Sequence, residues 1–169
     1  MTISLEVVKN REDLIINSIG ILFEKMILLE DNNNNEVIKV YNSSKLPCIT
    51  IVDYLKRLNY YANYSIECNI IALIYINRII EKDIYFNKIS SHRILASCTI
   101  LSIKYLEDKL YNNNYLAKVC GLTLSEMNKL ELYTLKLFDY KMYISDDEYN
   151  RYYKILKNLV YKHYNVDID

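Results

Sequence analysis

Two charged residues occupy positions where the helical pattern of the chain calls for apolar side chains. Lys104 is the first charge after the ten uncharged residues 94–103, close to the end of the most apolar segment. Glu131 interrupts a stripe at helical spacing, and an unpaired carboxylate there is costly, so it either lies at the stripe's edge in water or has a partner. Each alone is more often an edge residue that extends to water. Together they could form an ion pair at a surface that another protein covers. The apolar members of the stripe are Leu124, Met127, Leu135 and Phe138.

The chain contains no recognisable catalytic motif. HExxH, GxSxG and GxxxxGK[ST] are absent, and His92 has no Ser or Cys nucleophile in a known motif beside it. The adjacent acids Asp146 and Asp147 lie at a helix start, where the helix dipole already accounts for them. We therefore expect no enzyme activity, no cofactor and no metal site. The four cysteines form no CxxC pair and are expected to be small core hydrophobes: Cys48, Cys68, Cys98 and Cys120.

Composition restricts the fold and the class of partner. The 169 residues include 21 basic and 21 acidic side chains, so neither a chain-wide nucleic-acid footprint nor a polybasic membrane patch is expected. Two Gly and one Pro are too few for the turns of a sandwich or barrel, or for a phosphate-binding loop. An all-α fold remains. The N-terminus lacks a signal pattern and no uncharged segment could span a bilayer, so we expect a soluble intracellular protein.

Apolar spacing and capping residues predict seven helices. The first, at 3–30, carries a stripe of seven apolar residues and ends at the Asn-rich run 32–35, within a polar connector over 32–46 that ends at Pro47. Thr50, Ser65 and Ser91 are candidate N-caps for helices at 51–62, 66–82 and 92–108. The segment 94–103 is apolar nearly all round and should be the buried centre. The stripe of the first helix is Leu5, Val8, Ile15, Ile19, Leu22, Met26 and Leu29.

The last three predicted helices have clear start and stop signals. Asn112 opens a short helix that Gly121 ends. Two sequences of capping-box type begin the remaining helices, which run to about 139 and over about 146–163. These boxes are Thr123-Leu124-Ser125-Glu126 and Ser145-Asp146-Asp147-Glu148.

Five segments, in consistent order and spacing over 46–156, resemble the helices of a cyclin box. The segment 113–122, followed by 126–131, is the most diagnostic and is similar to the phosphate-regulon branch, the P-type and U-type cyclins. The resemblance implies an all-α fold with a single five-helix cyclin box and one flanking helix at each end. The implied divisions are an N-terminal helix and linker at 1–45, the box at 46–142 and a C-terminal helix and tail at 143–169, with no room for a second box. The five segments are 48–55, 74–78, 92–95 with 103–108, 113–122 and 126–131.

The resemblance implies a non-catalytic regulatory subunit that binds and activates a cyclin-dependent serine/threonine protein kinase. Lys104 and Glu131 match the lysine and glutamate with which cyclins grip the regulatory helix of the kinase, the helix that positions its active-site Lys–Glu pair. Asp108, expected one turn beyond Lys104 on the same helix face, matches an acid that meets an arginine near the activation segment. Arg93 and Glu126 match positions that dock a substrate or inhibitor, but are equally read as a first-turn residue and a capping-box acid.

The sequence also departs from the family pattern. Cys48 and Asn77 replace an arginine and an aspartate that pair in many cyclins, and their joint loss avoids an orphan buried charge. Tyr54, with Thr50 on the same face, stands where mitotic cyclins have a tryptophan in a motif-binding groove, so that docking mode is not expected.

Two other functions remain open from the sequence. One is a cyclin-fold transcription module on DNA, which should be basic on one face. The other is a helical adaptor without a kinase, in which the Lys104 and Glu131 charges are incidental. The favoured partners are a cyclin-dependent kinase and a protein substrate or inhibitor, with no nucleic acid and no membrane, in the cytoplasm, the nucleus or both.

Overall fold

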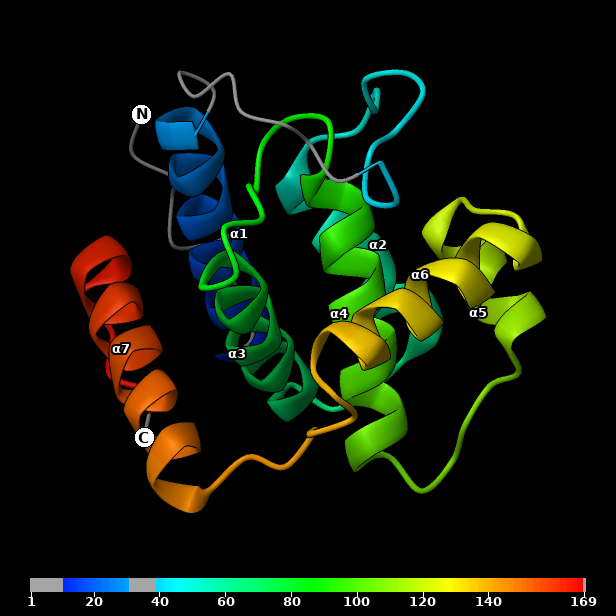
Figure 1. The fold of residues 1–169 in the computed structure, drawn as a ribbon. Helices are drawn as coiled ribbons and strands as arrows, with labels where there is room; N and C mark the ends of the chain where they lie inside the picture. The colour runs from blue at the N-terminus through cyan, green and yellow to red at the C-terminus, as the bar shows by residue number, and fades with distance from the viewer. Residues whose placement is uncertain (1–10, 31–38, 169) are drawn as a thin grey trace.

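The computed structural model describes residues 11–30 and 39–168, and in those ranges the chain forms seven helices and no strands (Figure 1). The predicted all-α fold is confirmed. None of the described helices is both long enough and apolar enough to cross a membrane. The helices are α1 Arg11–Glu30, α2 Ile51–Ala62, α3 Glu67–Ile80, α4 Ser91–Leu106, α5 Asn113–Cys120, α6 Leu124–Leu137 and α7 Asp146–Tyr164.

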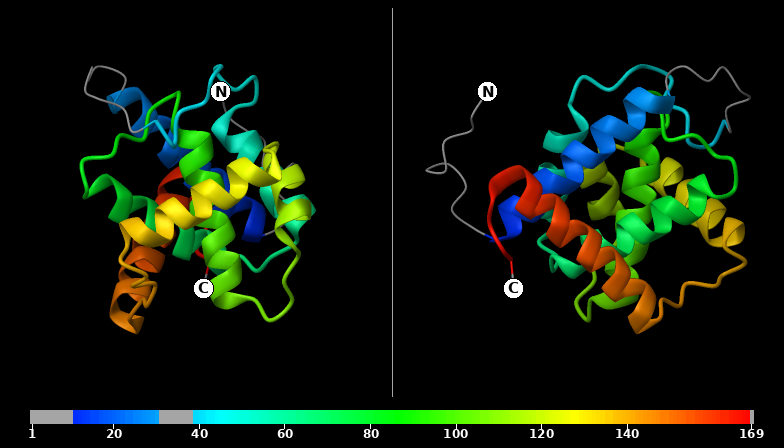
Figure 2. Two further views of the ribbon diagram at one scale, coloured as in Figure 1. Left: turned by 45° about the vertical axis from the view of Figure 1, so that its right-hand side comes forward. Right: turned by 90° about the vertical axis from the view of Figure 1, so that its left-hand side faces the viewer.

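Helix α4 is the centre of the molecule, as its uncharged sequence predicts. Every side chain of residues 94–103 is buried, including the hydroxyls of Ser97, Thr99 and Ser102. The helix packs against α2, α3 and α6, and Figure 2 shows it in the middle of the bundle with α6 crossing it. Burying one large apolar side chain contributes roughly 1.5–3 kcal/mol. The apolar face of α4 therefore positions the helices that carry the candidate site.

The two flanking helices pack on the same side of the bundle. Helix α1 lies against α2 and α7, and α7 also contacts α3 (Figure 1). The predicted stripe of α1 is partly wrong at its end, because Leu29 is 74% exposed whereas Phe23 and Ile27 are buried. The buried row Ile15, Ile19, Phe23 and Ile27 advances by four residues at a time. The predicted residues 3–10, with Leu5 and Val8, lie outside the described residues.

Four of the predicted helix starts have the expected side-chain caps. The hydroxyls of Thr50, Thr123 and Ser145 and the amide oxygen of Asn112 each accept a hydrogen bond from the backbone N–H three residues later. At Thr123 the box is reciprocal, because Glu126 accepts from the Thr123 N–H. At Ser145 it is not, because the Glu148 carboxylate binds Arg78 on α3 instead. Gly121 ends α5 in a left-handed conformation with φ 69°, as predicted.

Two predicted caps are wrong. Helix α3 begins one residue later than predicted, with Ile66 at the N-cap, and the Ser65 N–H donates to the Glu107 carboxylate at 2.7 Å. Helix α4 begins at Ser91 itself, and the hydroxyl of the preceding Ser90 donates to the Tyr85 carbonyl. Neither α3 nor α4 has a side-chain hydrogen bond at its N-cap.

Candidate partner-binding site

The charged ends of Lys104 and Glu131 meet between α4 and α6. Lys104 Nζ lies 2.5 Å from Glu131 Oε1, and the two side chains are only 28% and 15% exposed. The pair therefore lies at the surface with little water around it. Lys104 is in the last turn of α4, where the helix dipole favours a cation.

Glu131 lies beside the buried row of α6 rather than within it. The buried side chains are Met127, Leu130 and Thr134, whereas Leu124 of the predicted stripe is 42% exposed. Leu130 and Thr134 each lie one position before Glu131 and Leu135, through which the predicted stripe passes. Glu131 thus sits at the edge of the buried face and has a partner.

A third residue, Asn113, completes the arrangement and was not predicted as part of the site. Its side-chain amide donates to Glu131 Oε2 at 2.8 Å and to Asn128 Oδ1 at 2.9 Å. One carboxylate oxygen of Glu131 therefore faces Lys104 and the other faces Asn113, which orients the carboxylate. In the sequence Asn113 is one of three consecutive asparagines at a helix start, and only the packing of α5 on α6 brings it to Glu131.

Apolar side chains next to the pair are exposed. Leu132, which follows Glu131, is 47% exposed, and Tyr105 and Leu106, which follow Lys104, are each 42% exposed. Leu110, in the loop between α4 and α5, is 53% exposed. A partly buried ion pair, with exposed apolar and aromatic side chains beside it in the sequence, is consistent with an interface, in which aromatic residues are common.

Asp108 does not continue the face of Lys104, so that part of the prediction is wrong. Helix α4 ends at Leu106, and the next residue, Glu107, has an extended backbone with φ −85° and ψ 137°. The Glu107 carboxylate accepts hydrogen bonds from the Ser65 N–H and from the Cys68 thiol, which draws the chain away from the helical path. Asp108 is exposed in the loop that follows.

Arg93 and Glu126 also form an ion pair, which joins the first turn of α4 to that of α6. Glu126 Oε2 accepts from the backbone N–H and the hydroxyl of Thr123, and Oε1 accepts from Arg93. The Thr123 hydrogen bonds, together with Arg93, lower the pKa of Glu126 to about 2. The predicted role of Glu126 as a capping-box acid is therefore confirmed, whereas its ion pair with Arg93 was not predicted. The Arg93 side chain is 17% exposed, and its Nε has no hydrogen-bond partner.

A surface pocket of about 580 Å³ adjoins the Arg93–Glu126 pair. One wall is the segment before α2, including Pro47 and the exposed Cys48, which contradicts the prediction that every thiol is buried. The imidazole of His92 donates from Nε2 to the Ile49 carbonyl at 2.9 Å and holds that segment. Tyr54 forms the floor, with its hydroxyl bonded to the Cys120 carbonyl.

The side-chain chemistry of the site suits binding. In the described ranges, no cluster of three or more His, Cys, Asp or Glu side chains could hold a metal ion. The two interhelical ion pairs, the apolar side chains around them and the adjoining pocket are suited to recognising another macromolecule.

Comparisons with known proteins agree with the sequence resemblance. The family model "Cyclin" matches residues 22–142. Cyclin-U4-1 of Arabidopsis thaliana is 34% identical over 122 residues, which are 71% of this chain and 60% of that protein. Cyclin-U4-3 of the same plant is 37% identical over 108 residues, 63% of this chain and 49% of that protein. Cyclin-P3-1 of Oryza sativa subsp. japonica is 29% identical over 126 residues, 74% of this chain and 53% of that protein. The chain spans about half to three-fifths of the length of these curated relatives.

Proposed function

The chain belongs to the cyclin family, and we propose that it is a regulatory subunit that binds and activates a cyclin-dependent protein kinase. The observation that carries this proposal is the partly buried Lys104–Glu131 pair, which bridges α4 and α6 and has exposed apolar residues beside it in the sequence. These two residues match the positions with which cyclins grip a kinase.

The pair can bind a kinase backbone without coming apart. The Lys104 ammonium has three N–H donors, of which one points to Glu131, and a carboxylate has about four acceptor positions, of which Glu131 uses two. A kinase carbonyl can therefore bind Lys104 while a kinase N–H binds Glu131. The exposed Leu132, Tyr105 and Leu106 would pack beside the kinase regulatory helix. Binding this conformer better than the inactive one shifts the kinase towards its active state.

The experiment measures the affinity and activation of purified cyclin-dependent kinases, tested as a panel. Lys104→Ala or Glu131→Ala should weaken the complex by roughly 30-fold to several thousand-fold, the range for truncating one partner of a buried charge pair. Lys154→Ala removes an exposed lysine of α7, which packs against α1 and α3, and should leave the affinity unchanged.

A charge exchange separates binding from folding. Lys104→Glu combined with Glu131→Lys restores an ion pair within the chain but presents reversed donors and acceptors to the kinase. We expect this variant to unfold somewhat below the wild type, because it places an acid at the C-terminal end of α4 and removes the acceptor of Asn113, but to remain folded and to fail to bind. Wild-type kinase affinity in the exchanged variant would contradict the proposed grip.

A second role at the pocket beside Arg93 and Glu126 is the docking of a protein substrate or inhibitor. The supporting observation is that Arg93 has an unpartnered Nε and lines a pocket that joins apolar and charged walls. Arg93→Ala should raise the KM for a protein substrate of the complex and leave the KM for a short peptide substrate unchanged. An equal change in both KM values would contradict docking at this site.

A third role concerns Asp108, which we propose contacts an arginine near the kinase activation segment. Its exposure in the loop after α4 leaves the carboxylate accessible. At saturating concentrations of the regulatory chain, Asp108→Ala should lower the turnover of a kinase whose activation segment is unphosphorylated. Equal turnover at saturation would contradict this role.

A further inference from the structure

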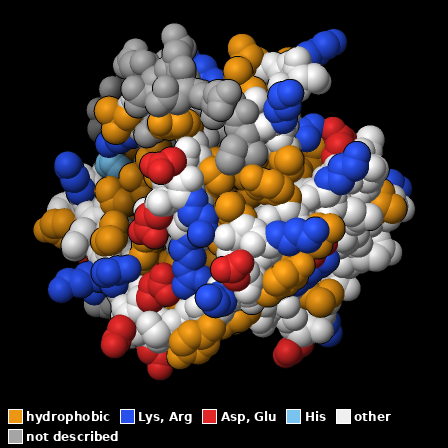
Figure 3. Space-filling model, viewed as in Figure 1, with side chains coloured by type: hydrophobic (Ala, Val, Ile, Leu, Met, Phe, Trp, Pro, Cys, Tyr) orange, Lys and Arg blue, Asp and Glu red, His pale blue; other side chains and the backbone are white. Residues whose placement is uncertain are grey.

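Two surface pockets meet at the Arg93–Glu126 pair. Besides the pocket of about 580 Å³ described above, a second pocket of about 460 Å³ lies between the segment 39–40 and α6, where Lys129 and Lys136 line it. Both pockets are lined by Arg93 and Glu126, so they adjoin on one face of the molecule, and we call the two together the double pocket. Figure 3, in the view of Figure 1, looks onto α6 and shows Lys and Arg side chains over that helix with hydrophobic side chains between them.

The double pocket concentrates positive charge on a chain whose formal net charge is zero. Among the described residues that line it, Glu126 is the one acid, and its carboxylate is already bound by Arg93 and Thr123. Its charge is balanced by Arg93, and no other lining acid balances the remaining cations. The rest of the chain therefore carries more acids than bases. The cations of the double pocket are Lys39, Lys45, Arg57, Arg93, Lys129 and Lys136.

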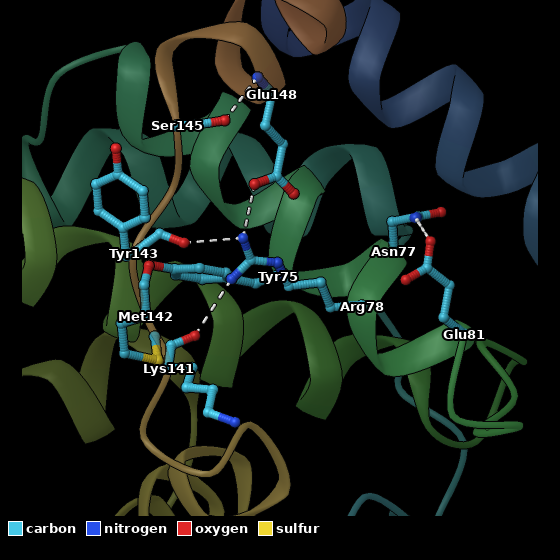
Figure 4. Close-up of polar contacts among 9 residues, drawn as sticks. All are labelled: Tyr75, Asn77, Arg78, Glu81, Lys141, Met142, Tyr143, Ser145 and Glu148. Atoms are coloured by element: carbon cyan, nitrogen blue, oxygen red, sulfur yellow. Dashed lines mark hydrogen bonds and ion pairs between the residues drawn. The ribbon is translucent and has the colours of Figure 1, made fainter.

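Four lysines of the double pocket are free to bind a ligand. All four are exposed, and in the part of the chain that the structure describes none has an ion pair or a side-chain hydrogen bond. They are Lys39, Lys45, Lys129 and Lys136. A structural cation differs from them: the Arg78 guanidinium of α3 donates to two main-chain carbonyls and pairs with Glu148 (Figure 4). Unpaired like charges that line the same pockets repel one another, and an anionic ligand relieves that repulsion.

Apolar and aromatic side chains line the double pocket between its cations. In the second pocket Leu132 is 47% exposed, and the Tyr133 ring meets the buried Tyr41 ring edge-on with centroids 5.4 Å apart. In the first pocket Pro47 and Tyr54 line the wall. A ligand that complements both features carries carboxylates together with apolar side chains, as a polypeptide segment does. A nucleic acid instead carries phosphates along its whole length, which the acid-rich remainder of the chain repels.

We propose that the double pocket docks an acidic segment of a protein substrate or inhibitor, in which Asp and Glu side chains bind the four lysines and apolar side chains occupy the two pockets. The inference rests on the docking role proposed above for Arg93 and names the chemistry of the segment that docks. Complementary charges at exposed positions select the partner and speed the encounter more than they tighten the complex. The affinity therefore falls as salt screens the lysines.

The test measures the binding of short fluorescein-labelled peptides to the full chain by fluorescence anisotropy at low ionic strength. The acidic peptide carries Asp and Glu among Leu and Val residues, its isostere carries Asn and Gln at the acidic positions, and its basic counterpart carries Lys and Arg there. The wild-type chain should bind the acidic peptide most tightly and should lose affinity for it as salt is added. Lys129→Gln combined with Lys136→Gln should weaken that affinity about two- to thirtyfold, the range for two exposed ion pairs.

A charge reversal separates the role of the lysines from a loss of folding. Lys129→Glu combined with Lys136→Glu should shift the preference of the chain from the acidic to the basic peptide, a change that loss of folding alone would not produce. The matched control is Lys154→Glu combined with Lys162→Glu, which makes the same change of net charge at exposed positions of α7. The control should keep the wild-type order of affinities.

Three results would overturn the inference. They are equal wild-type affinity for the acidic peptide and its isostere, the same shift of preference in the α7 control, and tighter binding of a single-stranded oligonucleotide than of the acidic peptide. None of these measurements needs a kinase. A chain that activates a kinase but binds the acidic peptide and its isostere equally would therefore overturn this inference alone. A chain that prefers the acidic peptide but activates no kinase would overturn the proposed kinase activation alone.

Discussion

Replacing Gly20 with alanine tests how closely α1 packs on the cyclin box. A Cβ at Gly20 would lie 2.8 Å from Val52 Cγ2 and 3.2 Å from Val52 Cα on α2. Alanine in a helix interior normally gains about 1 kcal/mol over glycine, whereas overpacking costs roughly 1–3 kcal/mol. Because a backbone atom is among the close contacts, α1 must shift and the upper part of that range applies. We expect a net loss of about 1–2 kcal/mol and a fall in Tm of about 2–8 °C.

The assay is thermal unfolding of Gly20→Ala, Val52→Ala and the double variant. Removing the Val52 methyls relieves the closest contact, so the double variant should be about 1 kcal/mol more stable than the sum of the two single effects predicts. Gly121→Ala is the matched control, because its Cβ would meet nothing within 4 Å and its cost comes only from φ 69°. In a double variant, the cost of Gly121→Ala should simply add to the cost of Val52→Ala. A higher Tm for Gly20→Ala, or simple additivity with Val52→Ala, would refute the close-packing argument.

Two further predictions concern stability, and both use unfolding measurements. The pKa of Glu126 is lowered to about 2 by its Thr123 and Arg93 contacts, so its stabilisation is present above its unfolded pKa near 4.5 and lost as the pH falls towards 2. Glu126→Gln should cost about 1 kcal/mol at pH 7, given a side chain 38% exposed, and only a small part of that near pH 2, where about half of the carboxylate is already protonated. Thr134→Val should cost about 2–4 kcal/mol, because the buried Tyr41 and Ser97 hydroxyls both lose a hydrogen-bond partner. A pH-independent Glu126→Gln effect, or a stable Thr134→Val variant, would contradict these contacts.

Local signals predicted the fold well because most of its determinants are local. Uncharged residues 94–103 can only be the buried centre, and Thr123 with Glu126 forms its capping box within four residues. The anomaly of Lys104 and Glu131 was also visible, because each charge interrupts an apolar pattern. That the two meet could not be read from either helix alone.

The errors arise where a contact distant in sequence overrides a local preference. Glu107 ends α4 two residues early because it binds Ser65, 42 positions away, and Asp108 leaves the predicted face as a result. Glu148 would complete a capping box with Ser145, but Arg78, 70 positions away, takes its carboxylate. An ion pair with little water around it outweighs a partly exposed cap. Neither of these two long-range contacts can be predicted from the local sequence without the three-dimensional packing.

The position of the Lys104–Glu131 pair depends on a buried polar contact that a kinase would never touch. The Thr134 hydroxyl donates to the Leu130 carbonyl and is hydrogen-bonded to the Tyr41 and Ser97 hydroxyls, at 2.7 and 2.5 Å. Apolar contacts between α4 and α6 would tolerate a small shift of one helix along the other, but these hydrogen bonds form in only one register of the two helices. Thr134 lies one turn after Glu131 and Ser97 two turns before Lys104, so the same register sets the ammonium opposite the carboxylate. A residue in the core thereby determines the geometry of the surface proposed to bind the kinase.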